Sequence, residues 1–600
     1  MTGDLFFIAM SWKLYKKMSD LLSGEIGTVK KSFGGKITFA LAYPNTYKIG
    51  MSNLGFQKVY SLLNEHNDVL CERVFLPLPQ EISQFKKEGI PLFSLESQTP
   101  VFDFDILAFS VTFESDYLNM LKILELSRIP IRCKDRNGRY PLILMGGICS
   151  TFNPEPLTDF IDIFFIGEAD EAIQEIVKLL RDVYNLSSSA MRKGGHWELY
   201  QRLSSIEGIY IPSAYDVTYN NSGAIEKISV RDGFPEKVKR RWVKNLNRTP
   251  TSSKLVTPNT VFGDMYLIEV GRGCGRHCRF CMSGFCYRPP RSYSADVILR
   301  EVSKGLKYRK KIGLVGSAIC DNPEIDEICN GIERMGVNIS VSSLRIDRLS
   351  KSLIHLLSES RHRTATLAPE AGSERLRKVI NKEMRDDEIL DAVQYIASEG
   401  IPDFKLYFLI GLPTETDDDI DAIISLSKRI KHSILKIARE KKHLGNITLS
   451  INPFIPKPFT PYQWEKMEDT ISLNRKIKKL KTGLKNVSNI FIIHELPKWS
   501  FVQALLSRGD RRVGELILKC HQLNDDWFKT FRETNINPEF YVYRERSFDE
   551  VLPWDHIDAG IRKDYLVKEA KKSRGGETSK ACPEKGECRR CGDFGCVINI

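Results

Sequence analysis

The alternation of apolar strands with amphipathic helices constrains the fold of this 600-residue chain more than any other feature. It occurs in two long series, separated by a less regular stretch. In the first series, apolar runs predict five strands, at residues 37–43, 69–75, 105–111, 142–145 and 161–166. Helical periodicity predicts helices at 51–65, 117–127 and 169–180. This alternation is typical of an α/β fold with a doubly wound parallel sheet.

Residues 35–185 are therefore expected to form a Rossmann-like domain. Ligands of such sheets bind beyond the carboxyl ends of the strands. Two glycine-containing turns follow predicted strands there, Gly146-Gly147 and Gly167-Glu168. The pattern predicts a small-molecule cleft at this edge, although the glycines could also do no more than end the strands.

The second series predicts a partial barrel. Its strands are expected at residues 266–270, 312–315, 338–342, 364–367, 404–409 and 447–451, with a helix in each of the crossovers that follow the first five. Six strands joined by right-handed crossovers suit a partial (β/α)6 barrel, which we place at residues 263–465.

Four other segments complete the organisation. Residues 1–34 form an N-terminal extension, and residues 186–262 form a connector with a hairpin turn at Asn220–Gly223. The connector ends in a basic run at 237–248, which could meet phosphates or simply be a solvated face. Residues 466–568 are predicted to be α-rich, and residues 569–600 form a cysteine-rich tail.

Charge and hydropathy exclude some classes of protein. No apolar run approaches the roughly 18 residues that a membrane-spanning helix needs, and the N-terminus lacks the basic start of a signal peptide. We therefore expect a cytoplasmic protein without a membrane span. The net charge of +12 permits RNA or an acidic cofactor as a partner without requiring either.

The strongest local signal is Cys274-x3-Cys278-x2-Cys281, directly after the first predicted barrel strand. Three soft thiolates on one short loop suit an iron–sulfur cluster that leaves one iron open. A structural zinc site is the alternative, and it would need His277 or Cys286 as a fourth ligand.

This motif, with its aromatic residue before the last cysteine, resembles that of the radical S-adenosylmethionine superfamily. The resemblance implies a [4Fe–4S] cluster on Cys274, Cys278 and Cys281, whose free iron chelates S-adenosylmethionine. Reductive cleavage of that molecule would yield a 5′-deoxyadenosyl radical. It also implies an electron donor of the flavodoxin or ferredoxin type.

The same resemblance assigns further contacts to S-adenosylmethionine. Phe280 is similar to the aromatic near the adenine, and Glu370 and Ser373 fit the ExGS pattern at the ribose. Gly411 lies in a loop that resembles the one contacting adenine. The later segment 452–461 resembles the last-strand segment of the methylthiotransferase and cobalamin-dependent branches of this superfamily. At the methionine group this chain departs from the usual Gly-Gly-Glu, so Ser317 is expected there, with Arg345 as the partner of the carboxylate.

The N-terminal domain resembles the cobalamin-binding domain of radical enzymes, on the segments Asn153–Asp162 and Phe165–Glu168. This implies that Gly146, Gly147, Gly167 and Glu168 contact cobalamin. The DxHxxG motif that supplies a histidine to cobalt is absent, and His66 is the only histidine of the domain. Cobalamin would therefore bind without that ligand, or the domain has lost the cofactor. Over nearly its whole length the chain also resembles an uncharacterised group of radical proteins.

Three functions follow from this interpretation. The first is a cobalamin-assisted C-methyltransferase, and the second is a radical enzyme that inserts sulfur or rearranges its substrate, with a cofactor-free N-terminal domain. The third is a non-catalytic iron–sulfur protein that binds nucleic acid or acts as a sensor. The substrate class stays open among protein, RNA, lipid and small metabolite.

The tail carries a second cysteine pattern, Cys582-x5-Cys588-x2-Cys591-x4-Cys596. Four thiolates can close a tetrahedral site, and a metal would supply the ordering free energy that this apolar-poor segment lacks. Zinc and an auxiliary [4Fe–4S] cluster both fit the spacing, and the alternative is a reduced, loose chain end.

Overall fold

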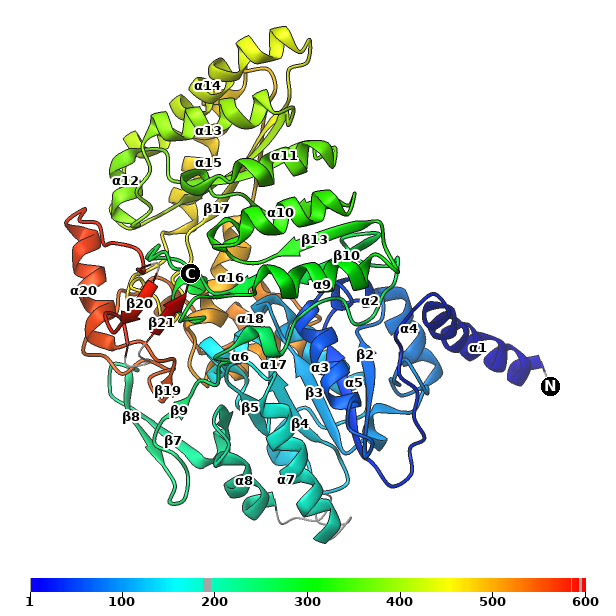
Figure 1. Cartoon of the computed structure of the whole chain (residues 1–600). Coiled ribbons are helices and arrows are strands. Elements are labelled where there is room, and N and C mark those ends of the chain that lie inside the picture. The colour runs from blue at the N-terminus through cyan, green and yellow to red at the C-terminus, as the bar shows by residue number, and fades with distance from the viewer. Residues whose placement is uncertain (1, 187–195, 584, 593–595, 600) are drawn as a thin grey trace.

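The computed structural model describes residues 2–186, 196–583, 585–592 and 596–599 (Figure 1). One contiguous apolar core runs through the N-terminal sheet, the second series of strands and the C-terminal helices. In Figure 1 the N-terminal domain, blue to cyan, lies below the strands of the second series, green to yellow.

The N-terminal sheet confirms the doubly wound prediction. All five predicted strands are present, as β1 (Ile37–Tyr43), β2 (Val69–Phe75), β3 (Ile106–Ser110), β4 (Leu142–Gly146) and β5 (Ile163–Phe165). They are parallel, in the order β2-β1-β3-β4-β5, which is the flavodoxin-like order. All seven residues of β1 are buried, as expected of a central strand covered on both faces.

Helices cover this sheet. α3 (Leu54–Asn64) and α7 (Ala172–Leu186) contact each other, and α5 (Tyr117–Leu126) contacts both α4 (Pro79–Glu88) and the C-terminal region. One strand extends the sheet beyond the predicted boundary: β6 (Ile209–Tyr210), within the predicted connector, pairs antiparallel with β5. The predicted hairpin is present as β7 (Tyr215–Tyr219) and β8 (Ile225–Val230).

The second series confirms the open barrel arc. Its six predicted strands are β10 (Met265–Glu269), β13 (Lys311–Val315), β14 (Asn338–Val341), β15 (Thr364–Glu370), β16 (Asp403–Ile410) and β17 (Ile447–Pro453). They form two parallel sheets, which a parallel bridge between Leu344 and Leu367 links. Within the described residues the arc does not close into a barrel.

A seventh strand lies within residues 466–568, the region predicted to be α-rich. β18 (Ile490–His494) pairs in parallel with β17 at the open edge of the arc. The strand contains a run of four apolar residues, 490–493, of which Phe491 and Ile493 are exposed at the edge of the arc.

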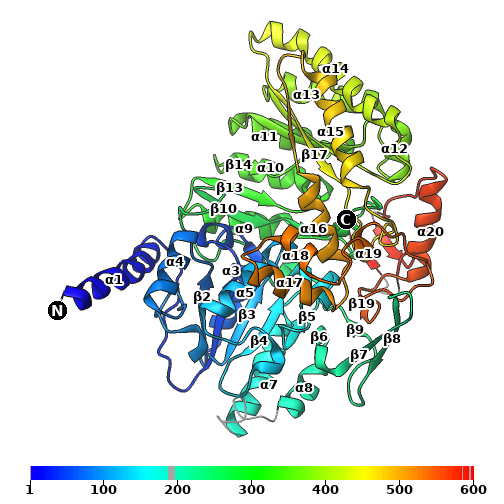
Figure 2. The ribbon, with the colours of Figure 1, turned by 180° about the vertical axis from the view of Figure 1, so that it is seen from behind.

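The C-terminal helices lie between the N-terminal sheet and the barrel arc. They are α16 (Pro497–Arg508), α17 (Val513–Gln522) and α18 (Trp527–Glu533), the orange segment of Figure 2. Asn153 is fully buried, and its side-chain amide donates to the carbonyls of Ser507 (3.0 Å) and Gly509 (2.8 Å). The segment predicted to surround a cofactor therefore also anchors the C-terminal region to the N-terminal domain.

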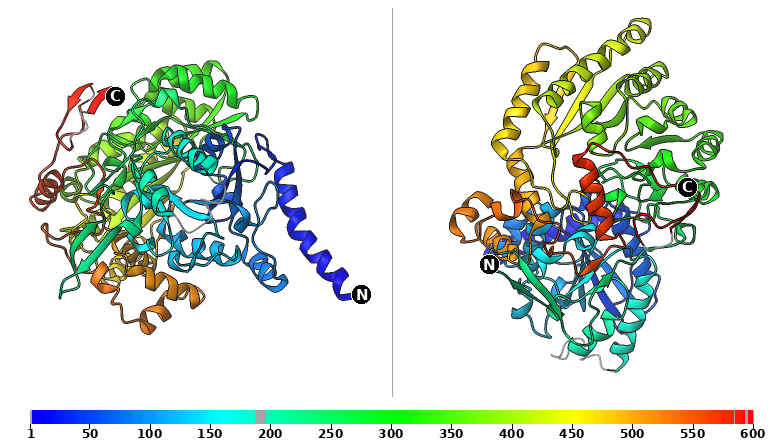
Figure 3. Two further views of the ribbon diagram at one scale, coloured as in Figure 1. Left: turned by 90° about the horizontal axis from the view of Figure 1, so that it is seen from below. Right: turned by 90° about the vertical axis from the view of Figure 1, so that its left-hand side faces the viewer.

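The N-terminal extension is largely helical. α1 (Thr2–Ser23) projects away from the rest of the molecule (Figure 3) and contacts α4. Among the described residues, no helix combines the length and the apolar character needed to cross a membrane.

Candidate functional site

The loop with Cys274, Cys278 and Cys281 leaves the carboxyl end of β10. Two short strands, β11 (Gly271–Arg272) and β12 (Arg291–Ser292), pair antiparallel and close its base. Gly273 has φ of +78°, and a Cβ there would lie 2.4 Å from the carbonyl oxygen of Tyr287. Only glycine allows this turn, so the sequence itself fixes where the cysteine loop begins.

The three thiols face one another across this loop. The pKa of Cys278 is raised to about 12, chiefly by burial; Lys382 opposes the rise, and the charges of Cys281 and Cys274 add to it. Burial likewise raises the pKa of Cys274 to about 11, against the backbone N–H of Arg276, which lowers it. Thiolates that are costly to bury alone are suited to a metal centre, whose positive charge offsets that cost.

Within the part of the chain that the structure describes, no group of three His, Cys, Asp or Glu side chains is arranged around a single metal ion.

Glu370 lies beside the same loop. It ends β15 after a break in the ladder between Leu367 and Glu370, and its φ of +68° turns the chain sharply. Its carboxylate accepts from the Nζ of Lys382 (3.1 Å), and both charges act on the pKa of Cys278. Sequence reasoning missed Lys382 because it lies in an ordinary turn after α12 (Glu374–Val379) with no motif around it.

A small apolar cluster brings the predicted loops together. Phe280 of the cysteine loop packs against a group of buried side chains separate from the main core, composed of Ala371, Leu376, Val379, Ile380, Leu412, Phe454 and Tyr462. Ala371 lies beside Glu370, Leu412 beside Gly411, and Phe454 in the segment 452–461, all singled out by the family resemblance. Leu376, Val379 and Ile380 come from α12 (Glu374–Val379) and its C-cap, and Tyr462 follows the last segment. The carboxyl ends of β15, β16 and β17 therefore converge on the cysteine loop.

Ser373 and Gly411 shape these loops. The Ser373 hydroxyl accepts from the backbone N–H of Leu376 (3.0 Å), which makes Ser373 the N-cap of α12, and it donates to Asp419. Gly411 has φ of +79°, and its N–H donates to the carboxylate of Glu415 (2.8 Å). Both residues thus fix the backbone beside the predicted nucleoside contacts.

Ser317 and Arg345, both predicted to contact the methionine group, have different surroundings. Ser317 follows β13 and lines a cavity between the barrel arc and the N-terminal domain. Arg345 forms ion pairs with Asp321 and Asp347, and Arg276 of the cysteine loop also pairs with Asp347 (3.0 Å). The structure therefore uses Arg345 in a salt-bridge network that reaches the cysteine loop.

The cavity beside Ser317 has a volume of about 520 Å3. From the N-terminal domain it is lined by Gly146, Gly147, Gly167 and Glu168, which are the residues predicted at the carboxyl edge of the sheet. From the barrel arc it is lined by Gly271–Gly273, Tyr287 and Val315–Ser317. The cleft predicted for one domain is thus closed by the base of the cysteine loop from the other.

Two glycines of this edge are required by close backbone contacts. Gly147 has φ of +107° and Gly167 has φ of +119°. A Cβ on Gly147 would lie 2.3 Å from the carbonyl oxygen of Val111, and one on Gly167 would lie 2.1 Å from that of Arg241. These contacts keep the strand ends free of side chains next to the cavity.

Glu168 connects the two halves of the molecule. Its carboxylate pairs with Arg291 (2.7 Å) and Arg272 (3.0 Å) at the base of the cysteine loop, and accepts from the N–H of Val243 (3.1 Å). Burial favours the neutral form, but the hydrogen bond from Arg291 and the charges of both arginines lower the pKa of Glu168 to about 2. Glu168 is therefore charged and holds the loop to the N-terminal domain.

The cysteine-rich tail packs against the cysteine loop. The N–H of Cys582 donates to the carbonyl of Gly275 (2.8 Å), and the buried Arg279 pairs with Glu569 (3.1 Å) of α20 (Lys563–Arg574). One nitrogen of Arg288 lies 3.2 Å from Cys582 Sγ and 3.1 Å from Cys591 Sγ. The spacing of the cysteines gave no sign of this docking.

Cys588 and Cys596 are brought together by a hairpin. β20 (Lys585–Cys588) and β21 (Cys596–Asn599) pair antiparallel with these two residues directly opposite each other. His277, considered above as a fourth ligand for the cysteine loop, instead lies toward the tail. It is buried, with Nδ1 2.6 Å from the Tyr565 hydroxyl and Nε2 3.5 Å from Cys582 Sγ.

Comparison with known families matches both halves of the chain. A family described as radical SAM proteins, N-terminal, matches residues 55–212, and the radical SAM superfamily matches residues 268–427. An uncharacterized protein of Methanocaldococcus jannaschii is 31% identical over 483 residues, which cover 80% of this chain and 90% of that protein.

More distant relatives carry functional names. An uncharacterized methyltransferase of Pyrococcus horikoshii is 25% identical over 305 residues, 48% of this chain and 58% of that protein. The tRNA-2-methylthio-N(6)-dimethylallyladenosine synthase of Acetivibrio thermocellus is 23% identical over 217 residues, 34% of this chain and 45% of that enzyme.

Solved structures give weaker matches. The radical S-adenosylmethionine methyltransferase TsrM from Kitasatospora setae, with cobalamin and a [4Fe–4S] cluster bound, has a TM-score of 0.45 at 12% identity, over 71% of this chain and 73% of that chain. The cobalamin-dependent radical enzyme OxsB has a TM-score of 0.46 at 13% identity, over 90% and 79%.

Proposed function

Because the chain belongs to the radical S-adenosylmethionine superfamily of enzymes, we propose that it is a methyltransferase that uses cobalamin as a second cofactor. The observation that carries the proposal is the 520 Å3 cavity between the carboxyl edge of the N-terminal sheet and the base of the cysteine loop. A cofactor in that cavity would lie next to the radical site. The relative named as a methyltransferase supports the same reaction class.

We assign the first cofactor site to the cysteine loop. Cys274, Cys278 and Cys281 would hold the [4Fe–4S] cluster that the superfamily implies, and Phe280, Ser317, Arg345, Glu370, Ser373 and Gly411 would hold S-adenosylmethionine. The bound cluster supplies the electron that cleaves S-adenosylmethionine to methionine and a 5′-deoxyadenosyl radical. The residues of this chain do the rest: the apolar cluster around Phe280 excludes water, and the strand-end loops orient the nucleoside.

We assign the second cofactor site to the interdomain cavity. At about 520 Å3 the cavity would enclose part of cobalamin rather than the whole molecule, and Gly146, Gly147 and Gly167 leave its floor open. No histidine is among its lining residues, and His66 lies elsewhere, so a protein histidine would not ligate cobalt. Bound cobalamin would carry a methyl group from S-adenosylmethionine to the substrate.

Filling this cavity tests the proposal. A Cβ on Gly146 would meet nothing closer than 4.0 Å and its φ is not positive, so Gly146→Leu should fold and project a side chain into the cavity. We expect full-length protein reconstituted without oxygen to retain cobalamin after desalting, and the variant to bind it at least about tenfold more weakly. Cobalt analysis and the visible spectrum measure both.

Gly34→Leu is the matched control, because Gly34 is exposed and has open space around it, away from the cavity. It should retain cobalamin, and both variants should still cleave S-adenosylmethionine. If the unaltered protein retains no cobalt, the radical enzyme does not methylate through cobalamin, and sulfur insertion or rearrangement with a cofactor-free N-terminal domain takes precedence.

We also propose that the tail binds a second metal through Cys582, Cys588, Cys591 and Cys596. Two observations support it: Cys582 and Cys591 share one arginine nitrogen, and the hairpin pairs Cys588 with Cys596. Arg288 then balances the negative charge of the thiolates.

Truncation after Ala581 tests the second site. We expect the shortened protein to lose either about four irons or one zinc per chain while it retains the iron of the cysteine loop, because the two ligand sets are separate. Metal analysis by mass spectrometry distinguishes a cluster from a zinc site. Unchanged iron and zinc contents would show that the tail holds thiols only.

A further inference from the structure

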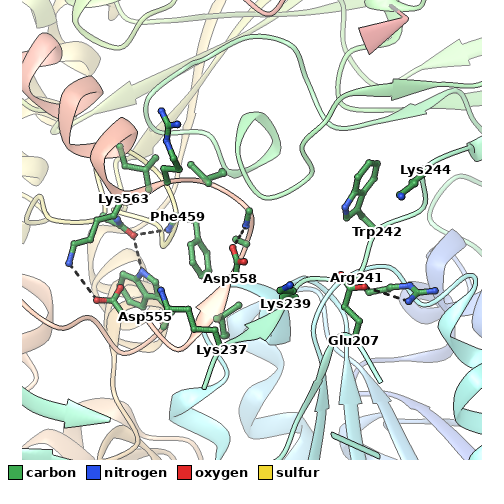
Figure 4. Close-up of a pocket in the computed structure, with 18 of the residues that line it drawn as sticks. Glu207, Lys237, Lys239, Arg241, Trp242, Lys244, Phe459, Asp555, Asp558 and Lys563 are labelled. Atoms are coloured by element: carbon green, nitrogen blue, oxygen red, sulfur yellow. Dashed lines mark hydrogen bonds and ion pairs between the residues drawn. The ribbon is translucent and has the colours of Figure 1, made fainter. Parts of the chain in front are cut away.

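A second and larger cavity lies on the other side of the connector (Figure 4). Its volume is about 1270 Å3, and its walls come from the connector, from the loop after β17 and from the segment 554–566. Neighbouring connector residues serve the two cavities: Arg240 lines the interdomain cavity, whereas Arg241 and Trp242 line the larger one. At this point the connector backbone separates the two cavities.

Cations dominate the lining of this cavity, which we call the basic cavity. Seven cationic side chains line it, Lys237, Lys239, Arg241, Lys244, Arg248, Arg562 and Lys563, against four acidic ones, Glu171, Glu207, Asp555 and Asp558. Cations on a concave surface produce a positive potential that attracts polyanions.

The acids are already engaged. Glu171 and Glu207 pair with Arg241, at 3.8 Å and 3.6 Å, and Asp555 pairs with Lys563 at 3.6 Å. Asp558 accepts from the N–H of Gly560 (2.8 Å).

Four cations are left over. Lys237, Lys239, Lys244 and Arg248 are exposed and form no ion pair with any described residue. In Figure 4 Lys237 and Lys239 lie lower in the view than Phe459 and Trp242, and Lys244 lies beside Trp242 at its right. Exposed cations that are not held in ion pairs are available to a ligand's phosphates.

Aromatic rings lie among these cations. Trp242 and Phe459 line the basic cavity from two sides, as Figure 4 shows, and Trp242 is half-buried with the guanidinium of Arg291 5.3 Å from its ring centre. Positive charge that follows a backbone, combined with aromatic faces, is how proteins bind single-stranded nucleic acids, whose unstacked bases stack on the rings. A base-paired duplex offers no free base faces.

The basic cavity is also tied to the radical site. Phe459 and Gln463 line it, and they belong to the loop whose Phe454 and Tyr462 pack against Phe280 of the cysteine loop. We propose that the basic cavity binds a single-stranded segment of nucleic acid and that this segment is the substrate of the enzyme. The second clause rests on the proposed function, whereas binding itself needs no cofactor.

Binding of a labelled single strand of about 20 nucleotides to the full-length protein tests the inference by fluorescence anisotropy at several salt concentrations. RNA and DNA of the same sequence are separate arms, and a difference between them tells whether the ribose hydroxyl is read. We expect binding to weaken with salt, by about 0.7 in the logarithmic slope for each phosphate contact.

Two variants of equal charge make the test specific. Lys237→Gln, Lys239→Gln, Lys244→Gln and Arg248→Gln together should weaken binding at least about 30-fold and reduce the salt slope by about 3. The control combines Lys428→Gln, Lys436→Gln, Lys478→Gln and Lys485→Gln, which are exposed on α14 (Asp417–Glu440), α15 (Thr470–Leu484) and the C-cap of α15 and remove the same charge. It should change binding less than about threefold.

A third variant tests whether a base of the bound strand stacks on Trp242. Trp242→Ala should weaken binding about 5- to 100-fold without changing the salt slope, and Trp242→Phe should restore most of it. Single variants at Lys239 and Lys244 give the same slope test if the fourfold variant does not fold.

Equal losses in the test and control variants would overturn the inference, because they would show attraction by net charge alone. Competition by polyglutamate as effective as that by RNA would also overturn it, in favour of an acidic protein. The binding assay contains neither S-adenosylmethionine nor cobalamin, so its failure leaves the cobalt test of the proposed function standing.

Discussion

Replacement of Cys274, Cys278 and Cys281 together by alanine is expected to abolish the formation of 5′-deoxyadenosine from S-adenosylmethionine. These are the three thiols of the motif that matches the superfamily, so we expect no cluster to assemble without them. We expect the visible absorbance of the cluster and about four irons per chain to disappear. Anaerobic reconstitution followed by chromatography of the reduced reaction mixture measures the effect.

Cys329→Ala is the control for this experiment, because Cys329 is a buried thiol on α10 (Ile325–Arg334) outside the site. It should retain both the cluster and the product. Formation of 5′-deoxyadenosine by the triple variant would show that the radical chemistry does not depend on this loop.

The second large effect concerns stability. Glu168→Gln removes the negative charge that Arg272 and Arg291 share at the base of the cysteine loop, and it leaves Arg291 without an acidic partner. Breaking a buried ion pair on one side typically costs about 3–5 kcal/mol. We expect the free energy of unfolding of the metal-free protein to fall by about 3 kcal/mol at neutral pH, measured by urea denaturation.

The pH dependence gives an independent check on this role. The pKa of Glu168 is lowered from 4.5 to about 2, so its contribution is fully present above the unfolded-state pKa and is lost as the pH falls from about 4.5 toward 2. The difference in stability between the unaltered protein and Glu168→Gln should therefore shrink over that window. Glu198→Gln, which removes an exposed carboxylate on α8 (His196–Ser204), is the control of equal charge change. A difference that is constant with pH would contradict the assignment.

The predicted strands of both sheets carry short apolar runs within a regular alternation with helices. β6 and β18 were not predicted as members of their sheets, for different reasons. β6 has only two residues, and β18 is a short apolar run, at residues 490–493, that follows a long basic helix. Periodicity alone does not distinguish such a run from a segment of a buried helix.

In the candidate site, too, some residues could be predicted from the sequence and some contacts could not. Cys274, Cys278 and Cys281 lie within eight residues, so their grouping is a local property of the chain. The pairing of Glu168 with Arg291 and the contact of Lys382 with Glu370 join separate elements, and side-chain type alone does not encode which partner is met. For this reason Glu168 was predicted only as a cofactor contact, and its two arginines were not foreseen.

The docking of the tail on the cysteine loop has a consequence for the order of biogenesis. Translation proceeds from the N-terminus, so the cysteine loop emerges from the ribosome nearly 300 residues before Glu569 and Cys582, which pack against it through Arg279 and Gly275. Throughout that interval the loop lacks these C-terminal contacts. Arrival of the last residues adds them, so we expect an iron–sulfur carrier to reach the loop more easily before synthesis ends than in a released, fully folded chain.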